Sequence, residues 1–269
     1  MIGLTYFVFN EKSMLKALVL YGYGINCENE SRLAIEKSGG KADILHLNKV
    51  LENPALLQDY NMLFIPGGFS FGDDLGSGRV FGNKMRFRLR EPLAEFAAAD
   101  KLILGICNGF QILVKMGLLP VPDFTQRVTI FANDSGHFED RWVFLKANQS
   151  SPCVFTRGID YTLAPVRHGE GKFIPRDAAV LGEMKKANQI TLQYVDENGQ
   201  LAGYPYNPNG SVENIAGICD KTGRIFGMMP HPEAFNIVQN CPYWVRGTVK
   251  EAYGMRLFKN ASEYMENKG

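Results

Sequence analysis

The sequence predicts an α/β protein with a doubly wound, mostly parallel sheet and an antiparallel extension in its second half. As far as Pro120, short apolar runs with strand character alternate with segments of helical periodicity. Several of these runs end at glycine-rich turns, as strands do where they pass into a helix or a loop. Beyond Pro120 this pattern gives way to segments in which apolar and polar residues alternate, which is typical of antiparallel strands.

Four strands and three helices are expected in the first half of the chain. The strands are predicted at residues 16–21, 42–47, 61–66 and 102–106, and the helices at 28–38, 90–99 and 110–116, with a glycine-rich loop at 69–82. Parallel strands joined by right-handed crossovers place their carboxyl ends along one edge of the sheet, where ligands bind in this class of fold. Residues 22–27, residues 67–71 and Cys107 should therefore lie along the same edge.

The second half should contribute the antiparallel strands and a terminal helix. Strands are predicted at residues 127–131 and 141–146, a hairpin at 215–219 and 224–228, and a helix at 248–265. Because the chain shows no internal repeat or linker, residues 16–269 are expected to form one domain after an N-terminal extension at 1–15. The apolar run Tyr6–Phe9 in that extension is too short for a signal peptide and lacks a basic start.

The composition argues against several classes of protein. The net charge of +1 gives no basic field for nucleic acid or an anionic membrane, and no stretch approaches the roughly 18 to 20 apolar residues of a membrane span. Five cysteines without a CxxC pair fit neither a disulfide framework nor a structural zinc site. We therefore expect a cytoplasmic protein with free thiols, no metal site, and no nucleic-acid or membrane partner.

The segment around Cys107 indicates a reactive cysteine. An apolar run at 102–106 leads into Cys107, which stands between Gly105 and Gly109 ahead of a predicted helix. This is the arrangement of a nucleophile elbow, in which small neighbours allow a sharp turn and the helix N-terminus favours a thiolate. The same glycines suit close packing of a helix on a sheet, with Cys107 as a small buried residue. On this segment alone the two interpretations are equal.

A cysteine nucleophile needs a base, and His231 is the preferred candidate among the four histidines. It follows the last strand of the predicted hairpin between two prolines, and Glu233, two residues on, can accept its ring N–H. His168, in a glycine-flanked segment, is the rival base, and His231 is preferred because Glu233 can hold it in place. His46 is expected to pack within a strand, and His137 to lie in a polar loop.

Acyl transfer also needs backbone N–H donors for a developing oxyanion. The N–H of Asn108, directly after the nucleophile, and the turn formed by Gly67 and Gly68 on the neighbouring strand are the expected donors. A turn that only reverses the chain explains the two glycines about equally well. The glycine-rich loop matches no phosphate-binding motif, and Asp73 with Asp74 is interpreted as part of a solvated loop rather than as a catalytic carboxylate pair.

Three motifs taken together resemble the class I, or triad, glutamine amidotransferases. They are, in chain order, Pro66-Gly67-Gly68, Gly105-Ile106-Cys107-Asn108-Gly109 with Gln111, and His231-Pro232-Glu233. Finer motifs are similar to the glutaminase component of phosphoribosylformylglycinamidine synthase, and the likeness runs from about Lys16 to Met265. These finer motifs occupy residues 26–30, 67–73, 133–139, 168–171 and 204–211.

The resemblance implies hydrolysis of glutamine to glutamate in de novo purine biosynthesis, on a sheet of the class I amidotransferase type. Cys107 is expected to attack the side-chain amide of glutamine, and His231, held by Glu233, to protonate the departing ammonia. The ammonia would pass to a separate ATP-dependent synthetase subunit, within a carbon–nitrogen ligase complex. No cofactor is expected in this chain, because ATP and Mg²⁺ belong to the synthetase. A small accessory subunit is a further partner that the resemblance allows.

The resemblance also supplies substrate-binding candidates. Beside Gly67, Gly68 and Asn108, the residues expected against glutamine are Gln111, Asn133, Ser135 and Phe138. After Pro120 the chain is longer than the shortest stand-alone subunits of this kind, which leaves the partner architecture open. Another class I amidotransferase, a cysteine hydrolase of the same fold and a non-catalytic module are the other hypotheses. Hydrolysis of other amides by the isolated chain would favour the hydrolase, and a dispensable triad would favour the module.

Overall fold

The computed structural model describes residues 14–247 and 249–268, so residues 1–13 of the predicted N-terminal extension lie outside the described residues. The helices are α1 (Glu28–Lys37), α2 (Leu47–Glu52), α3 (Arg79–Arg88), α4 (Arg90–Ala98), α5 (Asn108–Met116), α6 (Ala178–Lys186) and α7 (Met255–Glu266). The strands are β1 (Lys16–Tyr21), β2 (Lys41–His46), β3 (Met62–Ile65), β4 (Leu102–Ile106), β5 (Val128–Ala132), β6 (Glu139–Ala147), β7 (Tyr161–His168), β8 (Glu170–Pro175), β9 (Ile190–Val195), β10 (Ile215–Cys219) and β11 (Ile225–Met228). Leu15, at the end of the predicted extension, is buried in the core.

A sheet of nine strands carries the fold, in the order β2-β1-β3-β4-β11-β10-β9-β6-β7 within the described part of the chain. The first five strands run parallel to one another, whereas β10, β9, β6 and β7 pair antiparallel. A separate two-stranded sheet is formed by antiparallel β5 and β8. The predicted α/β sheet with an antiparallel extension is therefore confirmed, and the predicted hairpin is the β10–β11 pair.

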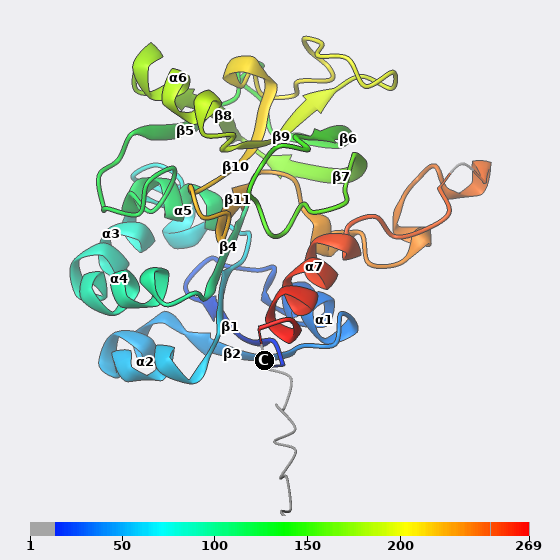
Figure 1. Ribbon diagram of the computed structural model, residues 1–269. Coiled ribbons are helices and arrows are strands. Elements are labelled where there is room, and N and C mark those ends of the chain that lie inside the picture. The colour runs from blue at the N-terminus through cyan, green and yellow to red at the C-terminus, as the bar shows by residue number, and fades with distance from the viewer. Residues whose placement is uncertain (1–13, 248, 269) are drawn as a thin grey trace, which may run out of the picture.

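Helices cover both faces of the parallel half of the sheet. Figure 1 shows α1 and α7 on one face and α3, α4 and α5 on the other, and the helices on each face contact one another. Every residue of β3 and β4 is buried, because these strands lie in the middle of the sheet between two helical layers. The carboxyl ends of β3, β4 and β11 meet at one edge, since the three strands are parallel neighbours.

The predicted loop at 69–82 is too long, because α3 begins at Arg79. Gly82, which was expected in the loop, lies inside this helix. A Cβ atom at Gly82 would stand 3.2 Å from the carbonyl oxygen of Ile112 in α5. The glycine therefore serves close packing of α3 on α5, a role that looks the same in sequence as a turn.

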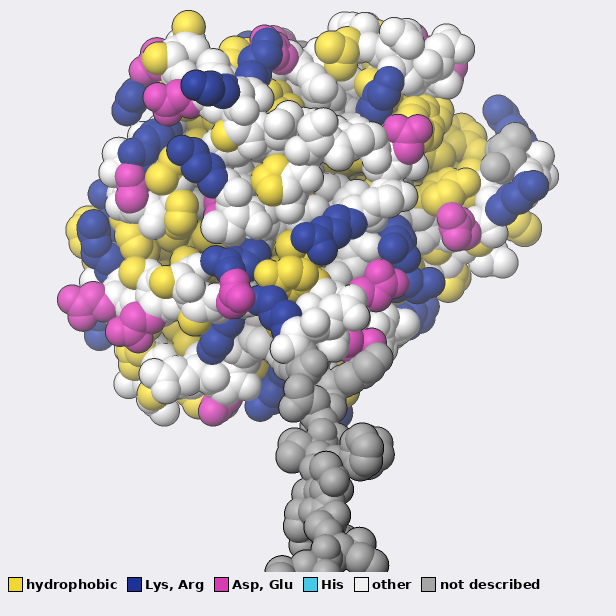
Figure 2. All heavy atoms as spheres, viewed as in Figure 1, with side chains coloured by type: hydrophobic (Ala, Val, Ile, Leu, Met, Phe, Trp, Pro, Cys, Tyr) yellow, Lys and Arg dark blue, Asp and Glu magenta, His cyan; other side chains and the backbone are white. Residues whose placement is uncertain are grey.

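The final helix begins at Met255 rather than at residue 248. Gly254 precedes it, and a Cβ atom there would lie 2.1 Å from the carbonyl oxygen of Pro232. The backbone of Gly254 therefore packs directly against the backbone of Pro232 before the helix begins. Residues 236–247 project from the body (Figure 1, orange). Figure 2 shows hydrophobic side chains gathered where this projection faces the body. A groove there of about 630 Å³ is lined mainly by Phe144, Tyr161, Leu163, Tyr243, Val249 and Tyr253.

Several elements of the second half were not predicted, and β7 shows why. Pro165 lies within this strand, and proline cannot donate to a strand ladder, so a proline argues against a central strand. Here β7 is the outermost strand of the sheet, where proline is tolerated. The strand ends at His168, which places this residue at a strand end rather than in a free loop.

The surface carries charges of both signs. On the face shown in Figure 2, basic and acidic side chains are interspersed, in keeping with the net charge of +1. Among the described residues, no helix is long and apolar enough to cross a membrane.

Candidate active site

Cys107 stands at a sharp turn between β4 and α5. Its backbone angles are φ 52° and ψ −108°, a conformation that side chains other than glycine rarely adopt and that commonly marks functional sites. The Cys107 N–H donates to the carbonyl oxygen of Met228 at the end of β11, at 2.8 Å. The turn is therefore held by the neighbouring strand, and it has the geometry of the nucleophile elbow that the sequence indicated.

The two glycines beside Cys107 make this turn possible. A Cβ atom on Gly109 would lie 1.8 Å from the carbonyl oxygen of Ile65, and one on Gly105 would lie 2.6 Å from that of Gly109. The glycines thus bring the first turn of α5 directly onto β3 and β4. The glycines pack the helix closely on the sheet, as one interpretation of the sequence expected, and this close packing is also what forms the elbow.

His231 and Glu233 form a buried pair on the residues that follow β11. The Nδ1 atom of His231 lies 2.6 Å from Oε1 of Glu233, and both side chains are almost fully buried. The His231 N–H donates to the carbonyl oxygen of Pro165 in β7, which fixes the backbone at this point. Burial alone would lower the pKa of His231, but the negative charge of Glu233 and the interactions with Cys107 and Cys27 outweigh it. The pKa of His231 is therefore raised well above its ordinary value.

Gly67 lets the histidine approach the cysteine. A Cβ atom on Gly67 would lie 2.6 Å from Cε1 of His231 and 3.4 Å from Cβ of Cys107. The next residue, Gly68, has a φ of 148° and lines the cavity that opens beside Cys107. Within the described residues, the backbone N–H groups of Gly68 and Asn108 have no hydrogen-bond acceptor. The sequence nominated the Asn108 N–H and the turn formed by Gly67 and Gly68 as oxyanion donors, and the Gly68 N–H belongs to that turn.

A cavity of about 170 Å³ opens at the elbow. Its wall includes Cys107, Gly68, Gln111 and Phe138 from the predicted set. The Gln111 Nε2 atom donates to the carbonyl oxygen of Glu170 at 2.6 Å, which fixes this side chain in the wall. A neighbouring cavity of about 250 Å³ contains Cys107 and His231 together.

Asn133 and Ser135 do not line either cavity. The Asn133 Nδ2 atom donates to the carbonyl oxygens of His137 and His168, and its Oδ1 atom accepts from the Gly171 N–H at 2.9 Å. Ser135 Oγ accepts from the His137 N–H at 3.3 Å. The structure therefore gives Asn133 the task of joining the 133–138 loop to the end of β7, whereas the sequence placed both residues against the substrate.

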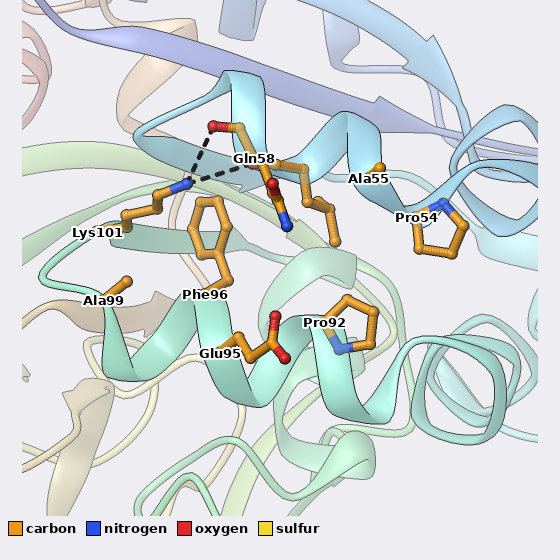
Figure 3. A pocket seen from close by; sticks show the side chains of 9 residues that line it. Pro54, Ala55, Gln58, Pro92, Glu95, Phe96, Ala99 and Lys101 are labelled. Carbon is orange, nitrogen blue, oxygen red and sulfur yellow. Dashed lines mark hydrogen bonds between the residues drawn. The ribbon is translucent and has the colours of Figure 1, made fainter.

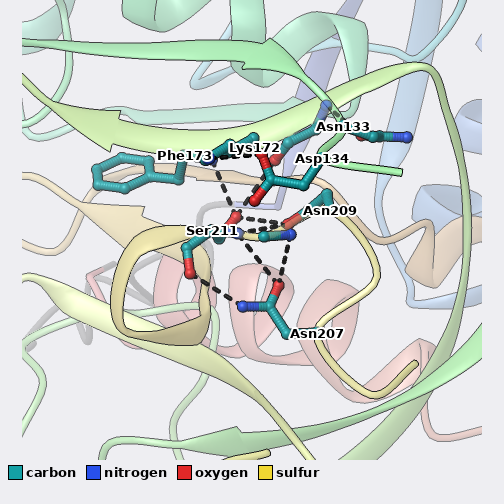
Figure 4. Close-up of polar contacts among 9 residues, drawn as sticks. Asn133, Asp134, Lys172, Phe173, Asn207, Asn209 and Ser211 are labelled. Carbon is teal, nitrogen blue, oxygen red and sulfur yellow. Dashed lines mark hydrogen bonds and ion pairs between the residues drawn. The ribbon is translucent and has the colours of Figure 1, made fainter. Parts of the chain in front are cut away.

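A buried polar network supports this loop from behind (Figure 4). Ser211 Oγ accepts from the Phe173 N–H at 2.9 Å and donates to Asn209 Oδ1 at 2.7 Å. Nearer the surface, Asp134 pairs with Lys172 at 2.6 Å, and the Asp134 N–H donates to the carbonyl oxygen of Asn209 at 3.2 Å. Asn209 and Ser211, two residues of the 204–211 motif, thus tie the loop to β8.

His168 is not suited to act as the base. It is buried, and its Nδ1 atom lies 3.2 Å from Oδ1 of Asn133. Burial and the nearby charge of His231 lower the pKa of His168 to about 3, so its ring stays neutral at physiological pH. The geometry thus favours His231 over its rival. His46 accepts the Asn48 N–H at the start of α2, at 3.1 Å.

The cavity walls also include residues that were not assigned a role from sequence, among them two carboxylates and a thiol. Asp73 and Glu170 line the cavity at the elbow, and Cys27 lines the neighbouring one. The sequence suggested that Asp73 lies in a solvated loop. In the structure its Oδ1 atom accepts from Asn108 Nδ2 at 3.3 Å, so this carboxylate is not freely solvated. Burial raises the pKa of Asp73, and the negative charge of Glu170 adds to that rise. The only sequence signal was the position of Asp73 in the glycine-rich loop at the same sheet edge.

Another depression, of about 460 Å³, lies at the opposite edge of the sheet (Figure 3). Lys101, just before β4, donates from Nζ to the carbonyl oxygens of Leu57 and Gln58 at its wall. Its walls hold no cysteine or histidine. It therefore offers no cysteine nucleophile and no histidine base, which are found together at the edge that carries Cys107.

A family model described as the CobB/CobQ-like glutamine amidotransferase domain matches residues 14–265. Together with the elbow and the buried histidine–glutamate pair, this match defines the class of protein as a glutamine amidotransferase.

Similar proteins specify the branch of that class. The PurQ subunit of phosphoribosylformylglycinamidine synthase from Methanococcus maripaludis is 44% identical over 269 residues, covering 94% of this chain and 98% of the relative. The subunit of the same name from Dehalococcoides mccartyi is 42% identical, with coverage of 94% and 98%. A chain in the solved structure of PurLQS from Thermotoga maritima matches with a TM-score of 0.69 and 31% identity, over 93% of this chain and 99% of that one. The chain belongs to the PurQ family.

Proposed function

We propose that this chain is the glutaminase subunit of a phosphoribosylformylglycinamidine synthase. The observation that carries the proposal is the strained elbow at Cys107, which shares a cavity with the buried pair of His231 and Glu233. A nucleophile, a base and a carboxylate that holds the base are the set required for covalent amide hydrolysis. The match to a glutamine amidotransferase domain indicates glutamine as the amide, and the similarity to PurQ subunits indicates the synthase.

In the proposed reaction the Cys107 thiolate attacks the amide carbon of glutamine. The oxygen that becomes negative is stabilised by the N–H groups of Gly68 and Asn108, which have no other acceptor among the described residues. The imidazolium of His231 gives a proton to the amide nitrogen, the carbon–nitrogen bond breaks, and ammonia leaves. His231 then takes a proton from water, which attacks the γ-glutamyl thioester and releases glutamate.

The ammonia is proposed to pass to a synthetase subunit of the kind that PurLQS contains, in the cytoplasm. That partner would hold ATP and Mg²⁺, so this chain needs no cofactor of its own for the hydrolysis. A small third subunit, in keeping with the three-part name of PurLQS, completes the proposed complex.

The test is to measure glutamate and ammonia released from glutamine by the full chain, alone and with its synthetase. We expect one ammonia for each glutamate, and a strong preference for glutamine over other amides. Equal turnover of unrelated amides by the isolated chain would instead identify a cysteine hydrolase of the same fold.

We further expect Asp73 and Glu170 to bind the α-ammonium group of glutamine. Two carboxylates face one small cavity beside Cys107, and a cation there would relieve the repulsion that contributes to the raised pKa of Asp73. Asp73→Asn should raise the KM for glutamine about 10- to 100-fold, because a hydrogen bond to a charged group contributes roughly 1.5–3 kcal/mol. The kcat should change much less than KM, since the carboxylate is not a group that moves protons in the reaction.

The decisive comparison uses 4-carbamoylbutanoate, which is glutamine without its α-amino group. The wild-type chain should discriminate strongly against this analogue, and Asp73→Asn should lose most of the discrimination. Asp74→Asn is the matched control, because Asp74 is the exposed neighbour and does not line the cavity. Unchanged discrimination in Asp73→Asn would refute the assignment and leave the glutaminase proposal intact.

A further inference from the structure

Cys27 is a second thiol beside His231, and the proposed reaction does not use it. It directly precedes α1 and lines the cavity that also contains Cys107 and His231. Its sulfur atom, a ring nitrogen of His231 and a carboxylate oxygen of Glu233 all lie within 4.8 Å of one another. Burial raises the pKa of the Cys27 thiol, so it rests as a neutral thiol rather than as a competing nucleophile.

His231 offers one ring nitrogen for a further bond. Its Nδ1 atom is held by Glu233 at 2.6 Å, so Nε2 is the ring nitrogen that can bind a metal once the metal displaces its proton. Nε2 is buried and has no hydrogen-bond partner among the residues that the structure describes. An imidazole whose other nitrogen is bound to a carboxylate is the form in which histidine usually binds zinc.

The Cys27 thiol and the His231 imidazole converge on the space beside Gly67, and the side chain of Cys107 starts from the same place. A Cβ atom on Gly67 would lie 3.4 Å from Sγ of Cys27, 3.4 Å from Cβ of Cys107 and 2.6 Å from Cε1 of His231. Because glycine has no side chain, nothing from this residue separates the three groups. Cysteine sulfur with histidine nitrogen is the donor set that zinc prefers over calcium or magnesium.

We propose that Cys27, His231 and Cys107 form a zinc-binding site that inhibits the glutaminase reaction. Zinc lies about 2.0–2.3 Å from nitrogen and sulfur ligands in tetrahedral sites, which brings those ligands to roughly 3.6 Å from one another. The Cys27 sulfur and a ring nitrogen of His231 lie within 4.8 Å of one another, and rotation of the Cys27 side chain about its Cα–Cβ bond is the movement that would bring them to this spacing. Zinc would displace the protons of the Cys27 thiol and of His231 Nε2 into solvent, so binding should strengthen as the pH rises. The metal would then bind the nucleophile and the base together, with Glu233 bonded to the other ring nitrogen of His231 and a water molecule in the fourth position.

Cobalt(II) is the direct probe, because thiolate ligands give it an intense near-ultraviolet charge-transfer absorption. The full wild-type chain should show this absorption, and Cys27→Ser should bind cobalt at least about tenfold more weakly. Cys241→Ser is the matched control, because Cys241 is a buried thiol in a separate hydrophobic cluster. Circular dichroism of both variants verifies that each remains folded. This binding assay does not depend on turnover, so its result stands whether or not the glutaminase proposal holds.

Zinc should also inhibit glutamine hydrolysis by the wild-type chain, and a chelator should restore the activity. The inhibition constant for zinc should be at least about tenfold higher in Cys27→Ser than in the wild type. X-ray absorption at the zinc edge of the wild-type complex should show two sulfur ligands and one imidazole, a measurement that needs no variant. Cobalt or zinc affinity that is unchanged in Cys27→Ser, or a single sulfur ligand, would overturn the proposal.

Discussion

Replacing Cys107 by serine should lower glutamine-dependent synthesis by the complex of this chain with its synthetase on the order of 10⁴-fold, the scale on which loss of a covalent nucleophile acts. Synthesis from added ammonia should be retained, because this chain is proposed only to supply ammonia. The hydroxyl of serine is a far weaker nucleophile than a thiolate, and it stands at the same strained position next to His231. Both rates can be measured on one preparation by changing only the nitrogen source.

Cys241→Ser is the control for this experiment, since it removes a buried thiol outside the two cavities. It should leave both nitrogen sources effective. A glutamine-like electrophile should label Cys107 before the other cysteines at neutral pH, as peptide mapping can show. Equal loss of glutamine-dependent and ammonia-dependent synthesis in Cys107→Ser would mean that Cys107 holds the complex together rather than hydrolysing glutamine.

The elbow and the histidine–glutamate pair could be predicted because their signals are local. A strand, a turn and a helix that surround Cys107 are contiguous in sequence, and Glu233 lies two residues from His231. The parallel order of the strands then places these pieces at one edge, since the topology rule holds for most α/β sheets. Local sequence therefore predicts the individual motifs, and the topology of parallel sheets predicts that they lie at the same edge.

The walls of the site could not be predicted in the same way. Asp73 and Glu170 are far apart in the chain, and nothing in either segment shows that they face a shared cavity. Asn133 illustrates the converse: a polar loop residue is expected to bind substrate, whereas in the structure its amide donates to carbonyl oxygens of the loop and of the end of β7. Which polar group faces the cavity depends on side-chain direction after long-range pairing, and residue type does not encode that direction.

The zinc site proposed at Cys27 could not be inferred from the sequence for a related reason. The motif that contains Cys27 was part of the resemblance, but the expectation of no metal site rested on the spacing of cysteines along the chain. Spacing detects sites built on one short segment. The three side chains beside Gly67 come instead from the ends of three strands, so only the folded chain brings them together.

Glutaminase turnover should fall in a graded series from wild type to Glu233→Gln to His231→Ala. Loss of His231 removes the group that moves the proton, which is commonly worth about 10²–10⁴-fold. Glutamine at 233 keeps an oxygen for the Nδ1–H of His231, so its effect should be smaller. The second oxygen of Glu233 is buried without a hydrogen-bond partner among the described residues. An amide N–H placed there would be unsatisfied, which costs about 1–3 kcal/mol of stability.

The pH profile of kcat/KM tests the role of Glu233 more sharply than the rate does. The carboxylate helps to raise the pKa of His231 against the opposing effect of burial, so its replacement by a neutral amide must lower that pKa. If the imidazolium is the acid, activity is lost when it deprotonates, and the alkaline limb of the profile should move to lower pH in Glu233→Gln. His168→Ala should leave this limb in place, since His168 is already neutral there. An alkaline limb that moves in His168→Ala and stays fixed in Glu233→Gln would show that the wrong histidine has been assigned.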